Sequence, residues 1–340
     1  MWMRYSWCAE KHRGRPAVEP AKMESLSRHW NMSRRQILFG GLGALCSSAA
    51  MRSRAADAAL VTEPVASGIH IRRGVDEDAS ATNGDAIANT GFIVGREAVA
   101  VIDPGGSLND GERLRARIRE VTRLPIRYVL MSHVHPDHIF GAGAFEQDRP
   151  QFVGHSRLPH AIAQRGEYYR TSLETILGKG RAGPLIVPTR LVADRDRIDL
   201  GDRVLMLTAH DVAHSDCDLS VFDPSSGTLL PADLLFVERV PSLDGRLKGW
   251  QKELTALKAI PARRAVPGHG PVSVGWPAGA TDLERYLDVL LRETRAAVKQ
   301  GLEISDAVAT VGQSERGKWK LFDDYQGHNV TQAFKEVEWE

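Results

Sequence analysis

Six residues in the first half of the chain constrain its fold more than any other stretch: His133-Val134-His135-Pro136-Asp137-His138. They follow Ile126–Met131, an apolar and β-branched run that predicts a buried strand. Neutral imidazole offers a nitrogen ligand and carboxylate an anionic oxygen, and zinc accepts both. Because Pro136 stops the strand, the loop after it can turn Asp137 and His138 toward a second point. A lone histidine would more often be an ordinary surface residue, but three histidines and an aspartate together predict a site for two adjacent metal ions.

Three further residues with metal-binding side chains come later in the chain, each beyond or at the end of a predicted strand. His214 follows the strand predicted at 204–207, and Asp233 ends the strand predicted at 228–230. His269 lies in Val-Pro-Gly-His-Gly-Pro, and small residues border all three positions. Small neighbours allow an ion and a substrate to approach the backbone closely. We therefore expect these three side chains to join the cluster at 133–138.

Strands and helices alternate from residue 89 onward, which predicts a layered α/β domain. We expect residues 59–280 to form this domain, with residues 281–340 as a helical segment packed on it. The first strands form a hairpin, Phe92–Val94 and Ala98–Ile102, around the turn Gly95-Arg96. The periodicity of apolar residues predicts helices over 110–121, 160–177, 250–260 and 282–299, and strands over 204–207, 219–222 and 228–230.

The order H-x-H-x-D-H, then His, Asp and His, resembles that of the metallo-β-lactamase superfamily, over residues 69 to about 275. The resemblance implies a four-layered αβ/βα sandwich with the metals at one edge of its two sheets, followed here by a C-terminal helical extension. It also implies two groups of metal ligands with a bridging aspartate: His133, His135 and His214 for the first ion, Asp137, His138 and His269 for the second, and Asp233 for both.

The ligand types favour two zinc ions, and iron or manganese would also suit them. Two such ions ~3.5–4 Å apart can share a water and lower its pKa toward ~7. The resemblance thus implies a hydrolase in which a metal-bridging hydroxide attacks an ester, thioester, lactone or amide. Asp137 and Asp233 would be the catalytic carboxylates, the first on the ion that receives the leaving group and the second orienting the hydroxide. Asp103, in Asp-Pro-Gly, matches a superfamily residue that does not itself bind the metal but orients one of the metal ligands.

Three C-terminal stretches, Val308–Gly312, Asn329–Phe334 and Glu336–Glu340, are similar to the quinoprotein relay system zinc metallohydrolases, which are sulfur-oxidation-protein-H-like. That similarity implies a periplasmic quinoprotein dehydrogenase as a partner, beside a small-molecule substrate. Three alternatives stay open: an iron-dependent persulfide dioxygenase, a non-catalytic metal-binding maturation partner, and a true β-lactamase, although nothing in the sequence marks a penicillin pocket. The dioxygenases usually carry one iron, whereas both ligand groups look complete here. Structural zinc sites are generally closed and cysteine-rich, unlike this set.

Residues 1–58 have the layout of an export signal. Ser33-Arg34-Arg35 precede an apolar run over 37–50 that is too short to span a bilayer, and Ala56-Asp57-Ala58 supplies an A-x-A cleavage pattern. The paired arginines resemble the twin-arginine signal, so we expect the protein to be folded before export and to work in the periplasm. Met32 is an alternative start to Met1.

Without residues 1–58 the chain has 34 basic and 39 acidic residues, a formal charge of −5. A net negative charge argues against a nucleic acid as partner. The mature chain has no apolar stretch of the ~18–20 residues that a membrane span requires. It keeps a single cysteine, Cys217, so no intrachain disulfide is expected, and this thiol is predicted to be buried and unreactive.

Overall fold

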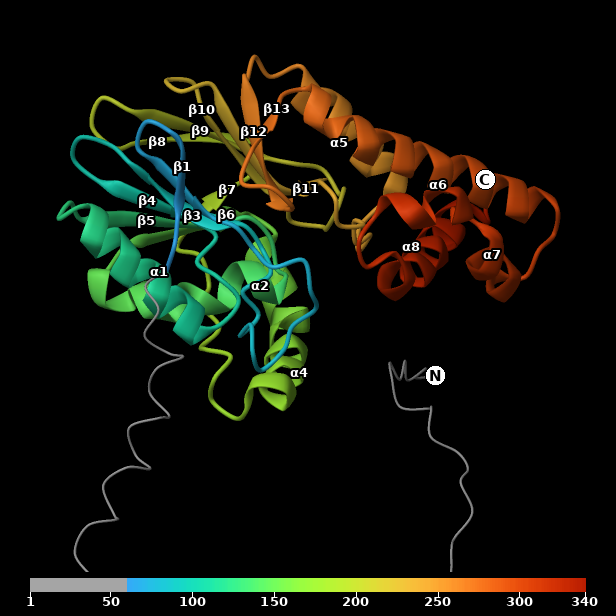
Figure 1. The fold of residues 1–340 in the computed structure, drawn as a ribbon, viewed down its shortest axis with the longest axis horizontal. Helices are drawn as coiled ribbons and strands as arrows, with labels where there is room; N and C mark the ends of the chain where they lie inside the picture. The colour runs from blue at the N-terminus through green and yellow to red at the C-terminus, as the bar shows by residue number, and fades with distance from the viewer. Residues whose placement is uncertain (1–59) are drawn as a thin grey trace, which may run out of the picture. The chain divides into compact units, whose positions relative to one another are not determined.

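A computed structural model describes residues 60–340, which form a sandwich of two β-sheets with helices on the outer faces (Figure 1). The predicted export signal and its cleavage pattern lie outside the described residues. Within 60–340 the first sheet has seven strands that neighbour one another in chain order: β1 (Glu63–Ala66), β2 (Ile69–Arg72), β3 (Thr90–Val94), β4 (Val99–Ile102), β5 (Ile126–Met131), β6 (Gln151–His155) and β7 (Arg190–Val192). The second sheet, in the same range, has the order β13-β12-β11-β10-β9-β8, with β8 (Arg195–Asp199), β9 (Val204–Ala209), β10 (Leu219–Asp223), β11 (Thr228–Phe236), β12 (Arg264–His269) and β13 (Val274–Gly275).

Strand β4 shows why the central strands are apolar throughout. Side chains alternate along a strand, so Val99 and Val101 point to one face and Ala100 and Ile102 to the other. The two valines pack in a core with the outer helices of the first sheet, whereas Ala100 and Ile102 pack in a second core between the sheets. A strand buried on both faces reads as an unbroken apolar run, which is why the sequence made this hairpin easy to predict.

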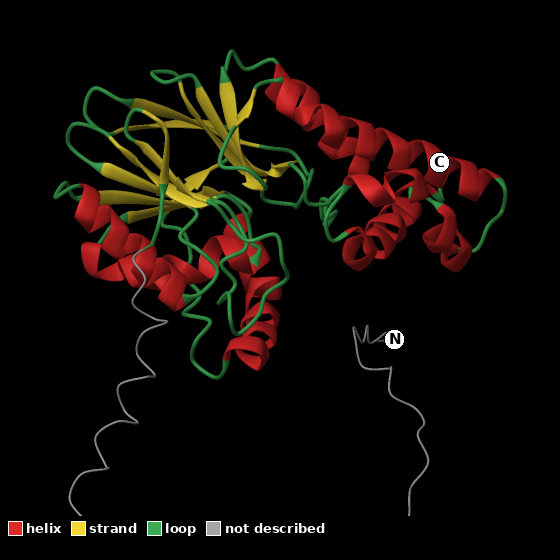
Figure 2. Ribbon diagram, in the orientation of Figure 1, coloured by secondary structure: helices red, strands yellow, loops and turns green. Residues whose placement is uncertain are grey.

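The outer face of the first sheet is covered by helices α1 (Leu108–Val121) and α4 (Glu167–Leu177), with the short α2 (Pro136–Ile139) beside them (Figure 2). The hydroxyl of Ser107 caps α1 by accepting the Asp110 N–H, and Leu114 and Ile118 bury its apolar stripe. The helix predicted at 160–177 exists, but it is divided. It begins as α3 (Leu158–Ala161), continues through one π-helical turn, Ile162–Gly166, and ends as α4.

Helix α5 (Leu247–Lys258) packs against β11 of the second sheet. Of the three C-terminal helices, α6 (Thr281–Lys299) and α8 (Phe322–Val337) pack against α5 and each other, and α7 (Ile304–Thr310) packs against α8. The predicted stripe of α6, which includes Leu283, Leu287 and Leu290, is buried in one core with Trp250 of α5. Residues on both sides of position 280 contribute to this core, so the C-terminal helices are part of the fourth layer. The four-layered αβ/βα arrangement with C-terminal helices is therefore confirmed.

One local expectation was wrong. The sequence predicts a strand over 228–230 with Asp233 at its end, but β11 continues to Phe236, and Asp233 lies inside it. Ala232 has a φ of 48°, and the pairing of β11 with β12 shifts register on both sides of this residue. Such a bulge in a strand re-aims the side chain that follows it, and no apolar pattern signals it in advance.

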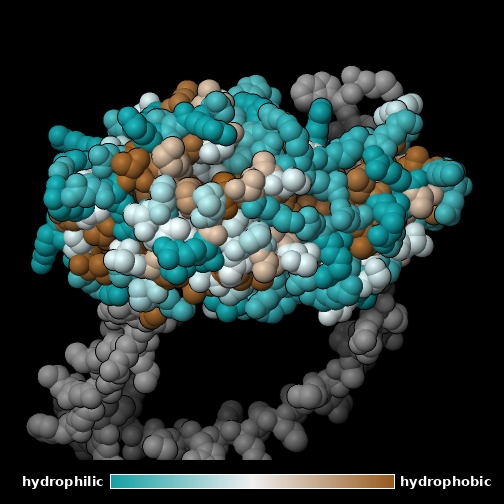
Figure 3. Space-filling model, turned by 90° about the horizontal axis from the view of Figure 1, so that it is seen from above, coloured by the Kyte–Doolittle hydropathy of each residue, from teal (hydrophilic) through white to brown (hydrophobic). Residues whose placement is uncertain are grey.

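The face of the molecule seen in Figure 3 is mostly hydrophilic, with hydrophobic side chains in small scattered groups. Over residues 60–340, no helix combines the length and the apolar character needed to cross a lipid bilayer.

Candidate metal centre

The structure brings together all seven predicted metal ligands, which are separated by up to 136 positions in the chain. They form two groups, and the candidate ligand atoms of each group lie within 4.8 Å of one another: His133, His135, His214 and Asp233 in the first, and Asp137, His138 and His269 in the second. The fold thus gathers two adjacent sets of nitrogen and oxygen donors at one edge of the sandwich.

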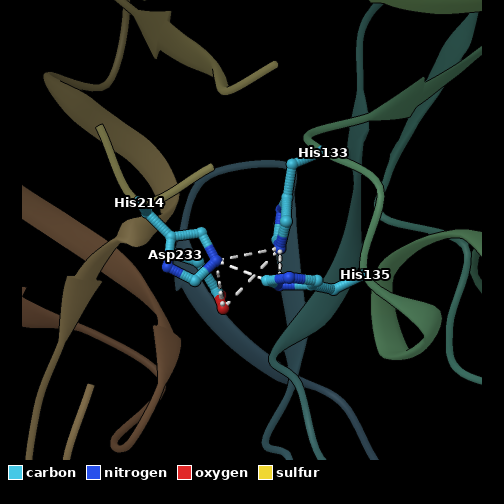
Figure 4. A group of neighbouring side chains, drawn as sticks. All are labelled: His133, His135, His214 and Asp233. Carbon is cyan, nitrogen blue, oxygen red and sulfur yellow. Dashed lines mark hydrogen bonds and ion pairs between the residues drawn. The ribbon is translucent and has the colours of Figure 1, made fainter. Parts of the chain in front are cut away.

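In the first group, three imidazole nitrogens converge on one point (Figure 4). His133 Nε2 lies 2.9 Å from His135 Nδ1, and His214 Nε2 lies 3.3 Å and 3.1 Å from these two atoms. His133 and His135 come from the loop after β5 in the first sheet, whereas His214 comes from the loop after β9 in the second sheet. The first group therefore exists only when the two sheets are packed together.

Asp233 lies between the two groups. Its Oδ2 is 3.5 Å from His214 Nε2 and 3.4 Å from His269 Nε2, and its Oδ1 is 3.1 Å from His138 Nε2. In the second group, Asp137 Oδ2 is 3.3 Å from His269 Nε2 and 3.5 Å from His138 Nε2. Asp233 Oδ2 thus lies near histidines of both groups and Oδ1 near the second group, which places this carboxylate to bridge two ions.

The outward nitrogen of every histidine in the cluster has a hydrogen-bond acceptor, and this determines where the protons lie. His214 Nδ1 is 2.7 Å from the carbonyl oxygen of Ser242, and His269 Nδ1 is 3.0 Å from that of Ile87. Carbonyl oxygens only accept, so His214 Nδ1 donates and its inward Nε2 carries a lone pair. The shorter contact of His269 Nδ1, to Ile87, favours the same arrangement there, although Arg239 Nη1, a donor, lies 3.3 Å from this nitrogen. Three more outward contacts follow the same pattern: His138 Nδ1 to Asp103 at 2.8 Å, His135 Nε2 to Asp244 at 3.2 Å, and His133 Nδ1 to the Ser132 hydroxyl at 2.9 Å.

These residues fit a pair of metal ions. Inward lone pairs ~3 Å apart repel one another unless a cation lies between them, and a metal or a proton can fill that role. His138 Nε2 and Asp233 Oδ1 are fully buried with no hydrogen-bond partner among the described residues. Burial alone would lower the pKa of His138, but the surrounding carboxylates of Asp233, Asp137 and Asp103 raise it well above its ordinary value, so this negative environment favours a cation at the second group. The donor set, imidazole with carboxylate, suits zinc and other divalent ions.

The backbone around the cluster explains how the donors reach it. His133 comes two residues after β5 ends, and His269 is the last residue of β12. Next to it, Gly268 is required for close approach, because a Cβ at this position would lie 1.9 Å from Asp233 Oδ1. The bulge in β11 and this glycine together create the space for the Asp233 carboxylate.

Asp103 stands behind the second group. Its carboxylate accepts the N–H of Ser132 at 2.8 Å and the Ser132 hydroxyl at 2.9 Å, as well as the His138 ring. The Ser132 oxygen is in turn the acceptor for His133. One buried aspartate thus orients an imidazole in each group, directly for His138 and through Ser132 for His133.

Two residues near the first group were missed from the sequence. Asp244 accepts from His135, and Arg165, in the π-helical turn, forms ion pairs with both Asp244 and Asp216. Burial opposes ionisation of Asp244, but His135 and Arg165 lower the pKa of its carboxyl below the ordinary value. Asp244 lies in the loop between β11 and α5, where no periodic pattern singles out a residue, and nothing in the periodicity of the helix predicted at 160–177 marks Arg165.

Two other residues near the cluster in sequence stand apart from it. Cys217 is completely buried and belongs to neither ligand group. His210, four residues before His214, bonds Glu253 at 2.8 Å and Ser220 at 2.7 Å instead.

Comparison with known proteins agrees with this geometry. A family model described as the metallo-beta-lactamase superfamily matches residues 83–269. A linear primary-alkylsulfatase from Pseudomonas sp. (strain ATCC 19151) is 31% identical over 96 residues, which are 28% of this chain and 17% of that enzyme. The match therefore spans about one sixth of the relative's length.

Two solved structures have the same fold. A metallo-beta-lactamase from Pontibacter korlensis matches with a TM-score of 0.55 and 18% identity, over 67% of this chain and 99% of that chain. TMB-1 matches with a TM-score of 0.54 and 14% identity, over 68% and 98% of the two chains. At these identities the similarity concerns the fold alone.

Proposed function

The chain belongs to the metallo-β-lactamase superfamily and is a metal-dependent hydrolase, and from this premise we propose that it is a binuclear zinc enzyme that cleaves an ester, thioester, lactone or amide. The observation that carries the proposal is the pair of ligand groups joined by Asp233. His133, His135 and His214 would hold one ion, and Asp137, His138 and His269 the other.

Two bound divalent ions would supply an activated water and a positive charge beside the substrate carbonyl. The side chains of the protein would balance the charge, orient the water and hold the imidazole rings in place. Asp233 and Asp137 would neutralise charge at the two groups, and Asp233, whose Oδ2 lies within 3.5 Å of a histidine in each group, could orient a water between them. Asp103 and Asp244 fix the ring orientation of His138 and His135.

The cluster is reached from solvent through one ligand of each group. The His135 side chain is 16% exposed and that of Asp137 is 10% exposed, whereas His133, His138 and His214 are at 1% or less. A structural site would be closed to substrate. Partial exposure of one donor in each group supports a catalytic role over that of a metal-binding maturation partner.

A sulfate ester is a second candidate substrate. The similarity to a linear primary-alkylsulfatase covers only a short segment of both proteins, but it favours testing an alkyl sulfate beside carbonyl substrates. We also propose a periplasmic location and a quinoprotein dehydrogenase as partner, which rest on the paired arginines and on the C-terminal sequence similarity.

The proposal is tested with the exported, mature protein. Zinc-loaded enzyme should bind two metal equivalents and hydrolyse at least one member of a panel of thioesters, lactones, amides and alkyl sulfates. Chelation should abolish this activity, and zinc should restore it. Asp233→Asn should lose activity and at least one metal equivalent, while Asp202→Asn, at an exposed position, should behave as wild type. Full activity of Asp233→Asn with two bound metals would contradict the proposal. Oxygen uptake with a persulfide by iron-loaded enzyme would favour the dioxygenase instead.

A further inference from the structure

Arg165 connects the two halves of the sandwich at the rim of the first ligand group. It belongs to the helix over 158–177, which covers the first sheet, and both of its partners belong to loops of the second half. Its Nη2 lies 2.9 Å from Asp216 Oδ1, and its Nη1 makes a close ion pair with Asp244 Oδ2. The side chains of Arg165 and Asp244 are 27% and 23% exposed, so solvent screens these ion pairs only in part.

Both partners of Arg165 are tied to metal ligands. Asp216 comes two residues after His214, and Asp244 Oδ2 is the oxygen that accepts from His135 Nε2. The loop of Asp244 is also bonded to the loop of His214: the Asp244 N–H donates to the His214 carbonyl at 3.0 Å, and His214 Nδ1 donates to the Ser242 carbonyl at 2.7 Å. A single guanidinium thus holds the supports of two of the three imidazoles in the first group.

The local backbone explains how Arg165 reaches this position. It lies in the π-helical turn Ile162–Gly166, which interrupts the otherwise α-helical segment. A π-turn adds a residue to the helix and changes the direction of the side chains that follow, and such turns are frequent at functional sites. Four residues later, the ring of Tyr169 packs edge-on against His135, 6.1 Å between centroids. Two side chains of one helix therefore reach the surroundings of one imidazole: Tyr169 packs on His135 itself, and Arg165 pairs with Asp244, the acceptor of His135.

We propose that Arg165 is a positioning residue for the first metal: by clamping Asp244 and Asp216, it holds His135 and His214 in the orientation that lets their ring nitrogens converge. The proposal rests on the binuclear site proposed above. It assigns no contact with substrate to Arg165, whose guanidinium acts through the carboxylates and imidazoles it supports.

The test compares Arg165→Ala, Arg165→Lys and wild type, with Arg170→Ala as the matched control. Arg170 is in the same helical segment, its side chain is 39% exposed, and its ion pairs within residues 60–340 are with Glu167 and Glu174 of that helix, so its loss should leave metal binding unchanged. Zinc affinity of each variant is measured by competition with a chromophoric chelator, and cobalt(II) substitution reports the ligand geometry through its visible absorption. Urea unfolding of the metal-free proteins monitors stability separately.

In Arg165→Ala, we expect one of the two metal affinities to fall by about 10- to 100-fold, the range typical for loss of an outer support. The cobalt spectrum should change for that metal alone, and Arg165→Lys should recover part of the affinity. Affinities within twofold of wild type for both metals would overturn the inference. If Arg165→Ala fails to fold, Arg165→Lys and Asp244→Asn decide by the same criterion. A wild-type protein that binds no pair of metals would instead refute the proposed function itself.

Discussion

Replacing Asp103 by asparagine should weaken metal binding at the second group by more than it destabilises the metal-free protein. The Asp103 carboxylate accepts three hydrogen bonds, from the Ser132 N–H, the Ser132 hydroxyl and His138 Nδ1. An asparagine can keep its oxygen on the Ser132 N–H, but its amide N–H₂ then faces the His138 ring. A metal on His138 Nε2 requires the ring proton to be on Nδ1. In the variant this N–H would face the asparagine N–H₂, and two donors cannot form a hydrogen bond with each other.

The expected loss is a 10- to 100-fold lower affinity for the second metal, about 1.4–2.8 kcal/mol. The metal-free protein should be affected less, since His138 can move its proton to Nε2, which lies 3.1 Å from Asp233 Oδ1. His138 Nδ1 then accepts from the asparagine amide where it donated to the Asp103 carboxylate. The free energy of unfolding of the metal-free protein should therefore fall by no more than about 1–2 kcal/mol. Affinity for the first metal should change only slightly, through Ser132 and His133.

Zinc competition titrations would measure both affinities, and long-range ¹H–¹⁵N correlation spectra would report the protonated nitrogen of His138. Asp148→Asn is a suitable control. Asp148 is a half-buried aspartate held by Arg115 and Arg119, so its replacement should cost stability without changing metal affinity. If Asp103→Asn binds both metals with wild-type affinity, the tautomer argument is wrong.

Two further predictions concern residues away from the metals. The side chain of Glu315 is buried, and although burial opposes ionisation, hydrogen bonds from Arg285, Lys318 and Trp319 lower its pKa to about 2. Because the folded-state pKa lies below the unfolded value near 4.5, this carboxylate stabilises the fold above pH ~4.5, and the contribution, at most ~3 kcal/mol, disappears as the pH falls toward 2. Urea unfolding of wild type and Glu315→Gln should therefore differ most near neutral pH and converge in acid; a difference independent of pH would count against this assignment. Cys217 is fully buried, and burial raises the pKa of its thiol far above the usual range, so a thiol reagent should label it only after unfolding. Rapid labelling of the folded protein would show that the loop at 213–218 opens.

Much of the metal centre was predictable because metal ligands are chemically specific. The spacing of His133, His135, Asp137 and His138 after an apolar strand already indicated two groups of donors. His214, Asp233 and His269 completed them by type and order along the chain. The hairpin β3–β4 and the stripe of α6 were predictable for a different reason, because an apolar period records which face a segment buries.

The local sequence determined the kinds of donor atom and the strands that carry most of them, since both depend on short-range pattern and side-chain chemistry. Only the tertiary structure decided where those donors meet. Asp233 reaches both ligand groups because a bulge at Ala232 and the absence of a side chain at Gly268 make room for it, and both are consequences of strand pairing. Asp244 supports His135 from 109 positions away, and Arg165 holds Asp244 from 79 positions away. Contacts between such distant segments leave no periodic trace in the sequence of either segment.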